Sequence, residues 1–121
     1  MGYRVHITRK VNWSDDGGPE IQLAEWIAVV RADREMRWDG VAETRGEAGA
    51  IIRIKNEGLS VWTAYSRHRE GGTMAWFYFW EGNVFVKNPD SEILRKMWSL
   101  AQALSAKVRG DEGEDYDAAG R

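Results

Sequence analysis

The amino-acid sequence predicts an α+β fold, in which an antiparallel sheet of five to six strands packs against two amphipathic helices in the order strand, helix, strand meander, helix. Two observations predict it. One is an aromatic hairpin pattern at residues 73–89, and the other is a pair of segments with apolar residues at helical spacing, one on either side of the strands. The simplest packing places both helices on one face of the sheet. One helix on each face is the alternative, and the residues alone do not choose between the two.

The hairpin at residues 73–89 is the densest aromatic run in a chain that has seven Trp among its 121 residues. Aromatic and β-branched residues alternate on either side of Glu81-Gly82-Asn83, where glycine and asparagine supply the positive φ angles of a tight turn. This alternation places four apolar residues on a core face: Phe77, Phe79, Val84 and Val86. The opposite face then carries Trp76, Tyr78, Trp80, Phe85 and Lys87. That is more aromatic surface than a solvated strand face normally has.

The chain before the hairpin contains the first helix and four strand-like segments. Residues 3–9 alternate apolar with polar side chains, which predicts a strand with one wet face. From Leu23 to about residue 33 the apolar residues recur at helical spacing, and Glu25 stands at the capping-box position relative to Gln22. Residues 38–40 form a turn cluster. The further strands are expected at residues 41–44, 50–56 and 59–66.

The second helix is expected to follow the hairpin directly. Asn88 is a good N-cap, and Pro89 suits the first helical position because its missing N–H would have no acceptor there. The apolar stripe continues to Leu104, after which the helix either runs on to Lys107 or gives way to a short extended piece through Val108. We therefore expect one domain over residues 1–110 and an acidic C-terminal tail over residues 111–121.

Composition excludes several classes of protein. The chain has no cysteine, so it has neither a disulfide framework nor thiolate metal ligands, and no apolar run is long enough to span a membrane. The N-terminal residues show no apolar signal segment, which favours a cytoplasmic location. A net charge of −2 differs from that of a general nucleic-acid binder, so a nucleic-acid partner is not expected.

No set of residues has the spacing of a catalytic or metal site. His6 and His68 are far apart in sequence, and no nucleophile elbow, phosphate loop or dinucleotide fingerprint occurs. The many carboxylates single out no pair of acid and base. The sequence therefore favours a binding protein over an enzyme, and it indicates no catalytic residue, metal or cofactor.

Three groups of residues are candidates for partner binding. The first is the aromatic face of the hairpin, with Trp76, Tyr78, Trp80 and Phe85. The second is a loop cluster suited to an anion or an acidic partner, with Arg67, His68 and Arg69. The third is the acidic cluster of the tail, suited to a basic partner, with Asp111, Glu112, Glu114 and Asp115. Each group also has a purely structural interpretation, namely a second hydrophobic layer, a solvated loop and a disordered tail.

Single-stranded nucleic acid is an alternative ligand for the aromatic face. Four basic residues could neutralise phosphates beside rings that stack on bases: Arg4, Arg53, Lys55 and Lys87. A small-ligand-binding or enzymatic domain of unknown substrate is the remaining alternative.

Short motifs along almost the whole chain resemble those of a family of small, uncharacterised bacterial proteins. The motifs are VHITRK at residues 5–10, EW at 25–26, EMRWDG at 35–40, VWTAYS at 61–66, GNVFVKNPD at 82–90, KMW at 96–98 and GDEGEDYD at 110–117. More loosely, the size and the aromatic and acidic content are similar to those of immunity proteins of polymorphic toxin systems. This resemblance implies a non-catalytic cytoplasmic module that binds and occludes a toxin domain, and the expected partner is a basic toxin.

Overall fold

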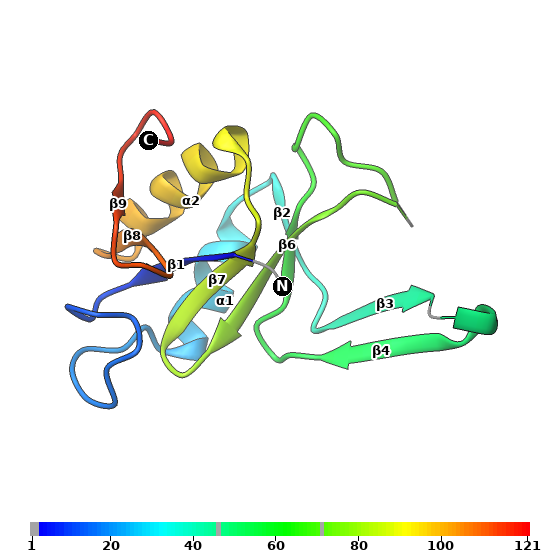
Figure 1. Ribbon diagram of the computed structural model, residues 1–121, viewed down its shortest axis with the longest axis horizontal. Coiled ribbons are helices and arrows are strands. Elements are labelled where there is room, and N and C mark those ends of the chain that lie inside the picture. Colours follow the sequence, from blue (N-terminus) through cyan, green and yellow to red (C-terminus); the bar gives the residue numbers. More distant parts are fainter. Residues whose placement is uncertain (1–2, 46, 71) are drawn as a thin grey trace.

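A computed structural model describes residues 3–45, 47–70 and 72–121, and it has the α+β fold that the sequence predicts (Figure 1). The helices are α1 (Leu23–Ala32) and α2 (Ser91–Ala103), and a short 3-10 turn spans Glu47–Gly49. The strands are β1 (Arg4–Thr8), β2 (Met36–Trp38), β3 (Val41–Arg45), β4 (Ile51–Lys55), β5 (Ser60–Trp62), β6 (Ala75–Trp80), β7 (Asn83–Lys87), β8 (Lys107–Gly110) and β9 (Asp115–Tyr116).

Within the described ranges, seven strands form one antiparallel sheet in the order β2-β5-β6-β7-β1-β8-β9. The N-terminal strand lies inside this sheet, because Ile7 pairs with Val84 on one side and with Val108 on the other. The sheet is larger than the five to six strands expected. The strands β2 and β9 are added, and β8 confirms the alternative in which the second helix ends and an extended piece includes Val108. Within the described residues, β3 and β4 pair with each other and not with this sheet.

The aromatic hairpin is confirmed with the predicted faces. Phe79 pairs with Val84, and Tyr78 pairs with Phe85, so the two sets of side chains point to opposite sides of the sheet. The turn residues are Glu81 and Gly82, with φ angles of 48° and 80°, as a two-residue type I′ turn requires. Asn83 was expected in this turn but is the first residue of β7.

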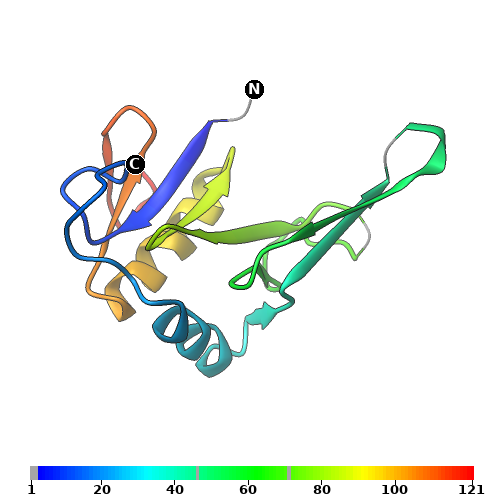
Figure 2. The ribbon, with the colours of Figure 1, turned by 90° about the horizontal axis from the view of Figure 1, so that it is seen from below.

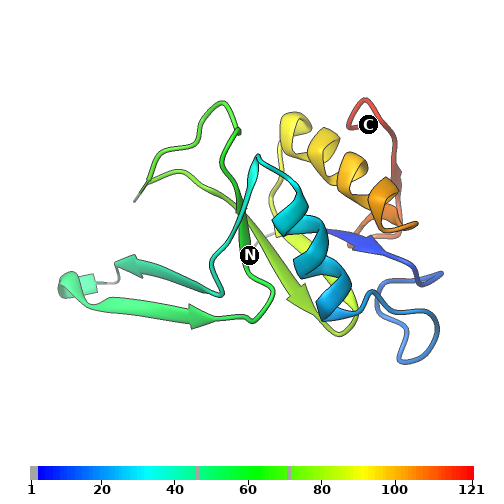
Figure 3. The same ribbon diagram turned by 180° about the vertical axis from the view of Figure 1, so that it is seen from behind.

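Both helices cover one face of the sheet, as Figures 2 and 3 show. The core between the helices and the sheet is a single cluster of buried side chains. Its central members are Trp26 and Val30 of α1, Ile93, Met97, Leu100 and Ala101 of α2, and Val5, Ile7, Phe77, Val84, Val86 and Val108 of the sheet. The arrangement with one helix on each face is therefore excluded.

Trp26 fixes α1 on the sheet. Its fully buried indole lies 6.1 Å from the ring of Phe77, measured between centroids, and its Nε1–H donates to the Gly58 carbonyl at 2.7 Å. A Cβ atom at Gly58 would lie only 2.4 Å from the Cβ of Phe79. A residue with a side chain would therefore force Phe79 and the indole away from the backbone that they contact.

The start of α2 differs from the expectation. Asn88 adopts a left-handed φ of 49° and pairs with the N-terminal strand, because its Oδ1 accepts the Tyr3 N–H at 2.8 Å. The N-cap is Asp90, whose Oδ1 accepts the Ile93 N–H at 2.9 Å. The prediction of Asn88 as the cap was wrong because it could not include this long-range contact with Tyr3.

The hairpin of β3 and β4 projects from the body as an arm (Figures 1 and 2). The arm is held at its root by the N–H groups of Asp39 and Gly40, which both donate to the Leu59 carbonyl at 2.9 Å. Immediately before the root, β2 pairs with β5. The sequence indicated only a turn at residues 38–40, and the strand expected at residues 59–66 is shortened to β5.

The two faces of the hairpin should respond differently to truncation of a side chain. Phe77 is fully buried against Trp26, so Phe77→Ala should lower the free energy of unfolding by about 3–5 kcal/mol. Trp80 is 61% exposed, so Trp80→Ala should change it by no more than about 0.5–1 kcal/mol. Urea denaturation of both variants measures this. Equal losses in the two variants would show that both faces are buried.

Candidate binding surface

The face of the sheet opposite the helices, called the open face below, carries the aromatic residues that the sequence singles out. Strand pairing places Tyr78, Phe85 and His6 next to one another on β6, β7 and β1. The same row continues through Arg109 on β8 to Asp115 on β9. Because directly paired residues share a face, this row crosses five strands of the sheet.

The rings of this row are in contact, in two stacked pairs joined by a pair whose planes are tilted by 52°. Tyr78 and Phe85 have ring centroids 5.0 Å apart and an interplanar angle of 11°. The His6 ring lies 6.1 Å from Phe85 and is stacked on its other side against Trp13, at 4.0 Å and 6°. Four rings from β6, β7, β1 and the loop after β1 thus form one continuous layer.

Two cations cover part of this layer. The guanidinium of Arg4 lies 4.7 Å from the centroid of Phe85, and the ammonium of Lys87 lies 5.1 Å from that of Tyr78. Arg4 and Lys87 are paired on neighbouring strands, and both are exposed. The open face therefore combines aromatic rings with positive charge.

The four predicted aromatic residues differ in how accessible they are. Trp80 is 61% exposed, and Trp76 and Tyr78 are partly exposed. Phe85 is only 9% exposed, because Arg4 and Tyr78 lie against it. A partner could thus contact Trp80 and Trp76 directly, whereas Phe85 supports the neighbouring side chains from below.

Trp13, which sequence reasoning did not select, is held on the open face by the loop between β1 and α1. The nearly buried Lys10 ammonium donates to the carbonyls of Asp15 and Glu81, at 2.9 and 3.0 Å, and so ties this loop to the hairpin turn. Asn83 Nδ2 donates to the Trp13 carbonyl at 2.8 Å. The position of Trp13 before a cluster of turn residues predicts a loop there, but it does not predict that the indole stacks on another ring.

A small recess opens beside Trp80, between this loop and the hairpin turn. It has a volume of about 160 Å³ and is called the Trp80 recess below. Its aromatic walls are Trp13, Phe85, Trp80 and the imidazole of His6. Arg4, Glu81 and Asn83 also line it.

Most of the predicted acidic cluster takes part in the fold. Asp111 accepts a hydrogen bond from the Arg4 N–H at 2.8 Å and lies 2.8 Å from His6 Nε2. Glu114 accepts a hydrogen bond from the Tyr3 hydroxyl, and this bond raises the pKa of Tyr3 to about 12. Asp115, in β9, accepts from Arg109 Nε at 2.7 Å, and the side chain of Glu112 is exposed.

The other predicted basic residues lie away from the aromatic row. Arg67, His68 and Arg69 belong to the loop between β5 and β6. This loop lies before the first residue of β6, whereas Trp80 is the last residue of β6. Arg67 and Arg69 are exposed, and His68 Nε2 lies 3.7 Å from Glu70. Arg53 and Lys55 belong to β4 in the arm. Among the described residues, Arg4 and Lys87 are the predicted cations that lie over rings of the open face.

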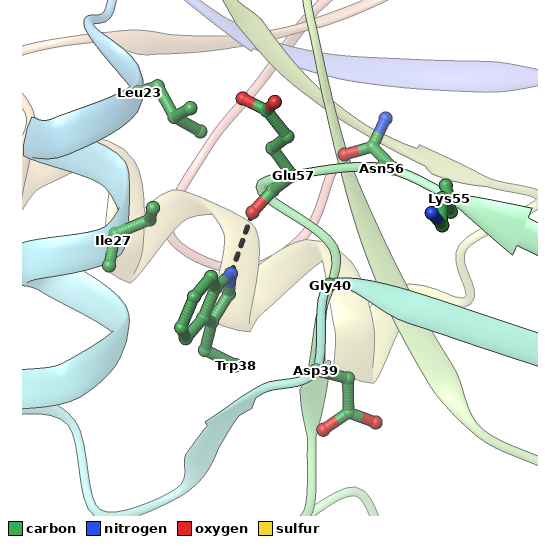
Figure 4. A pocket seen from close by; sticks show the side chains of 8 residues that line it. All are labelled: Leu23, Ile27, Trp38, Asp39, Gly40, Lys55, Asn56 and Glu57. Atoms are coloured by element: carbon green, nitrogen blue, oxygen red, sulfur yellow. Dashed lines mark hydrogen bonds between the residues drawn. The ribbon is translucent and has the colours of Figure 1, made fainter.

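A second concavity of about 710 Å³ lies at the root of the arm (Figure 4). Leu23 and Ile27 of α1 face the indole of Trp38, which is 42% exposed and donates its Nε1–H to the Glu57 carbonyl at 2.7 Å. Of the residues that the sequence singled out for binding, Lys55 lines this cleft, and none of the three predicted partner-binding groups does. Sequence reasoning assigned Trp38 to a turn and so gave no signal for it.

Within the described ranges, no three His, Cys, Asp or Glu side chains are placed to hold a metal ion together. The same part of the chain has no helix with the length and apolar character needed to cross a membrane. Comparisons of the chain with family models, curated proteins and solved structures gave no match. The binding surface therefore has to be interpreted from its own geometry.

Stability should fall in mild acid because of His6. Burial lowers the pKa of its imidazole below the ordinary value of 6.5, and the bond to Asp111 opposes this shift. The unfolded chain then takes up a proton at a higher pH than the folded one, so the free energy of unfolding should decrease as pH falls below about 6.5. His6→Phe should remove this decrease between pH 7.5 and 5.5 in urea titrations. An equally steep decrease in the variant would assign the effect to other groups.

Removal of residues 111–121 should destabilise the protein. The truncation deletes β9 and the contacts of Asp111 with Arg4 and His6, so we expect a loss on the order of 2 kcal/mol and a fall in Tm of roughly 5–10 °C. Thermal melts by circular dichroism measure this. Glu112→Gln, which changes an exposed side chain of the same segment, should melt like the wild type. An unchanged Tm after truncation would instead mark the segment as an accessory arm.

Proposed function

We propose that this protein is a non-catalytic binding protein that occludes a partner protein with its open face. Most concretely, we propose a cytoplasmic immunity protein that covers a toxin domain by direct contact. The single observation that carries the proposal is the exposed indole of Trp80, which stands with the partly exposed Trp76 on a sheet whose other face is covered by both helices.

The physical argument rests on the side chains and on their support. Trp, Tyr and Arg are the residues that most often dominate the free energy of protein binding. Here they stand on paired strands, and Tyr78 is stacked on Phe85. Little conformational entropy is then lost on association, because the rings already have defined positions.

The charges of the open face favour a partner with an acidic or electron-rich patch. Arg4 and Lys87 are its exposed cations, whereas Asp111, Glu114 and Asp115 have partners within the fold. We therefore assign direct contact to the open face rather than to the acidic segment. This differs from the basic toxin cleft that the tail alone suggested.

Single-stranded nucleic acid is the second candidate partner. The observation that favours it is the alternation of cations with rings, with Arg4 over Phe85 and Lys87 over Tyr78. Phosphate contacts make affinity fall steeply with salt, in proportion to the number of counterions released. A protein partner held mainly by Trp76 and Trp80 should show a much shallower dependence.

Genomic context and co-expression test the proposed function. An immunity protein should be encoded next to a secreted protein with a variable C-terminal toxin domain, and co-expression should restore growth to cells that produce this domain. Neutralising each candidate acid or base in turn should leave this protection intact, whereas an enzyme would lose its activity at one or two positions. Loss of protection at one such residue, with affinity unchanged, would overturn the proposal.

Trp80→Ala should weaken binding of the toxin domain by about 2 kcal/mol, or roughly thirtyfold, because it removes the most exposed ring of the open face. Trp38→Ala removes an exposed indole at the other concavity and is the matched control. Calorimetric titration at two salt concentrations measures both affinities. A thirtyfold loss in Trp38→Ala with none in Trp80→Ala would move the interface to the root of the arm.

A further inference from the structure

Asn83, one of the residues that line the Trp80 recess, carries a buried acceptor without a donor among the described residues. Asn83 is 4% exposed, and its Nδ2 donates to the Trp13 carbonyl at 2.8 Å. Because a carbonyl accepts only from the NH₂ end of an amide, this bond fixes the orientation of the side chain. Its Oδ1 is therefore the remaining atom, and it has no hydrogen-bond partner among the described residues. A buried acceptor in this state is unfavourable and favours any donor that can reach it.

The size and walls of the recess select the kind of group that fits. A cavity of about 150 Å³ with apolar walls is known to hold one benzene molecule. The Trp80 recess has about 160 Å³, and rings of Trp13, Trp80 and Phe85 line it. The recess is therefore large enough for one six-membered ring, which would meet both these rings and the polar groups of Ser14, Glu81 and Asn83.

The charges at the recess favour a neutral occupant. Arg4 and Glu81 both line it and carry opposite charges. Burial lowers the pKa of His6, so its imidazole is neutral near pH 7. A single neutral ring with one hydrogen-bond donor at its tip satisfies every one of these conditions, and among protein side chains this describes tyrosine.

We propose that the Trp80 recess receives a tyrosine side chain of the partner protein, with its ring against Trp13, Phe85 and Trp80 and its hydroxyl donating to Asn83 Oδ1. The proposal rests on the proposed function, because it makes the recess part of the surface that the partner covers. Oδ1 is closed to water, so the hydroxyl reaches it when the outer rings shift. Trp80, whose side chain is 61% exposed, is the wall that has to turn aside, whereas Trp13 stays stacked on His6.

A titration with two probes tests the recess without a partner. The probes are N-acetyl-tyrosinamide and N-acetyl-phenylalaninamide, which share the ring and differ in the hydroxyl. Heteronuclear NMR of the full-length protein follows the indole N–H signals of Trp13 and Trp80 and the side-chain amide of Asn83. The tyrosine probe should bind in the millimolar range and roughly three- to tenfold more tightly than the phenylalanine probe, which is the effect of one hydrogen bond.

Three variants separate the contributions. Trp80→Ala removes a wall of the recess and should lower the affinity for both probes. Trp38→Ala lies at the other concavity and should bind both probes with the affinity of the wild type. Asn83→Ala should bind both probes with equal affinity. If Asn83→Ala loses its dispersed NMR signals and is unfolded, the affinities of the two probes for the wild type and for Trp80→Ala decide whether the recess binds a tyrosine ring.

Several results would overturn the inference. They are equal affinity of the two probes for the wild type, signal changes that map away from the recess, or no binding of either probe at millimolar concentration. If neither probe binds while Trp80→Ala still weakens binding of the toxin domain, the inference about the recess is overturned and the proposed function stands. If the tyrosine probe binds while Trp80→Ala leaves the affinity for the toxin domain unchanged, the open face is not the interface, and the assignment of the ring to a partner protein is overturned.

Discussion

The contact of Trp26 with Gly58 and Phe77 is the interaction on which the arrangement of the molecule depends. The indole is fully buried, it donates to the Gly58 carbonyl, and its ring lies beside that of Phe77 at the centre of β6. Because the glycine has no side chain, Phe79 and Trp26 can both approach its backbone. This contact joins α1 to the sheet on the same face as α2. The opposite face of β6 and β7 is then left without a helix, although its side chains are aromatic.

The chain stabilises this uncovered face from within. Tyr78 stacks on Phe85, His6 stacks on Trp13, and the His6 ring is tilted by 52° to Phe85 between the two pairs. Arg4 and Lys87 lie over two of the rings, and Asp111 lies 2.8 Å from the imidazole Nε2. These contacts bury Phe85, leave Trp13, Trp76 and Tyr78 partly exposed, and leave Trp80 as the most exposed ring. The open face thus has an inner layer of packed rings that supports the fold and outer indoles that we propose contact the partner.

The features that could be predicted from the sequence are those set by local patterns. Alternation about the Glu81-Gly82 turn predicted both faces of the hairpin, and helical spacing predicted α1 and the apolar stripe of α2. The features that could not be predicted depend on contacts between distant residues. Asn88 was a plausible cap, yet it pairs with Tyr3, and Asp90 caps α2 instead. The strand β9, which pairs with β8, is two residues long and lies in an acidic segment whose composition is typical of a disordered tail. The recess beside Trp80 requires the loop that carries Trp13, and no local pattern places that ring on His6.

Hydroxyl-radical footprinting of the protein, alone and with the proposed toxin domain bound, tests most directly whether the open face is the contact surface. Oxidation of each Trp side chain reports its access to solvent. In the free protein Trp80 should be oxidised fastest and Trp26 should be protected, since their exposed fractions are 61% and 0%. In the complex Trp80 and Trp76 should become protected, while Trp38 at the root of the arm should be oxidised at an unchanged rate. Protection of Trp38 with continued oxidation of Trp80 would contradict the account.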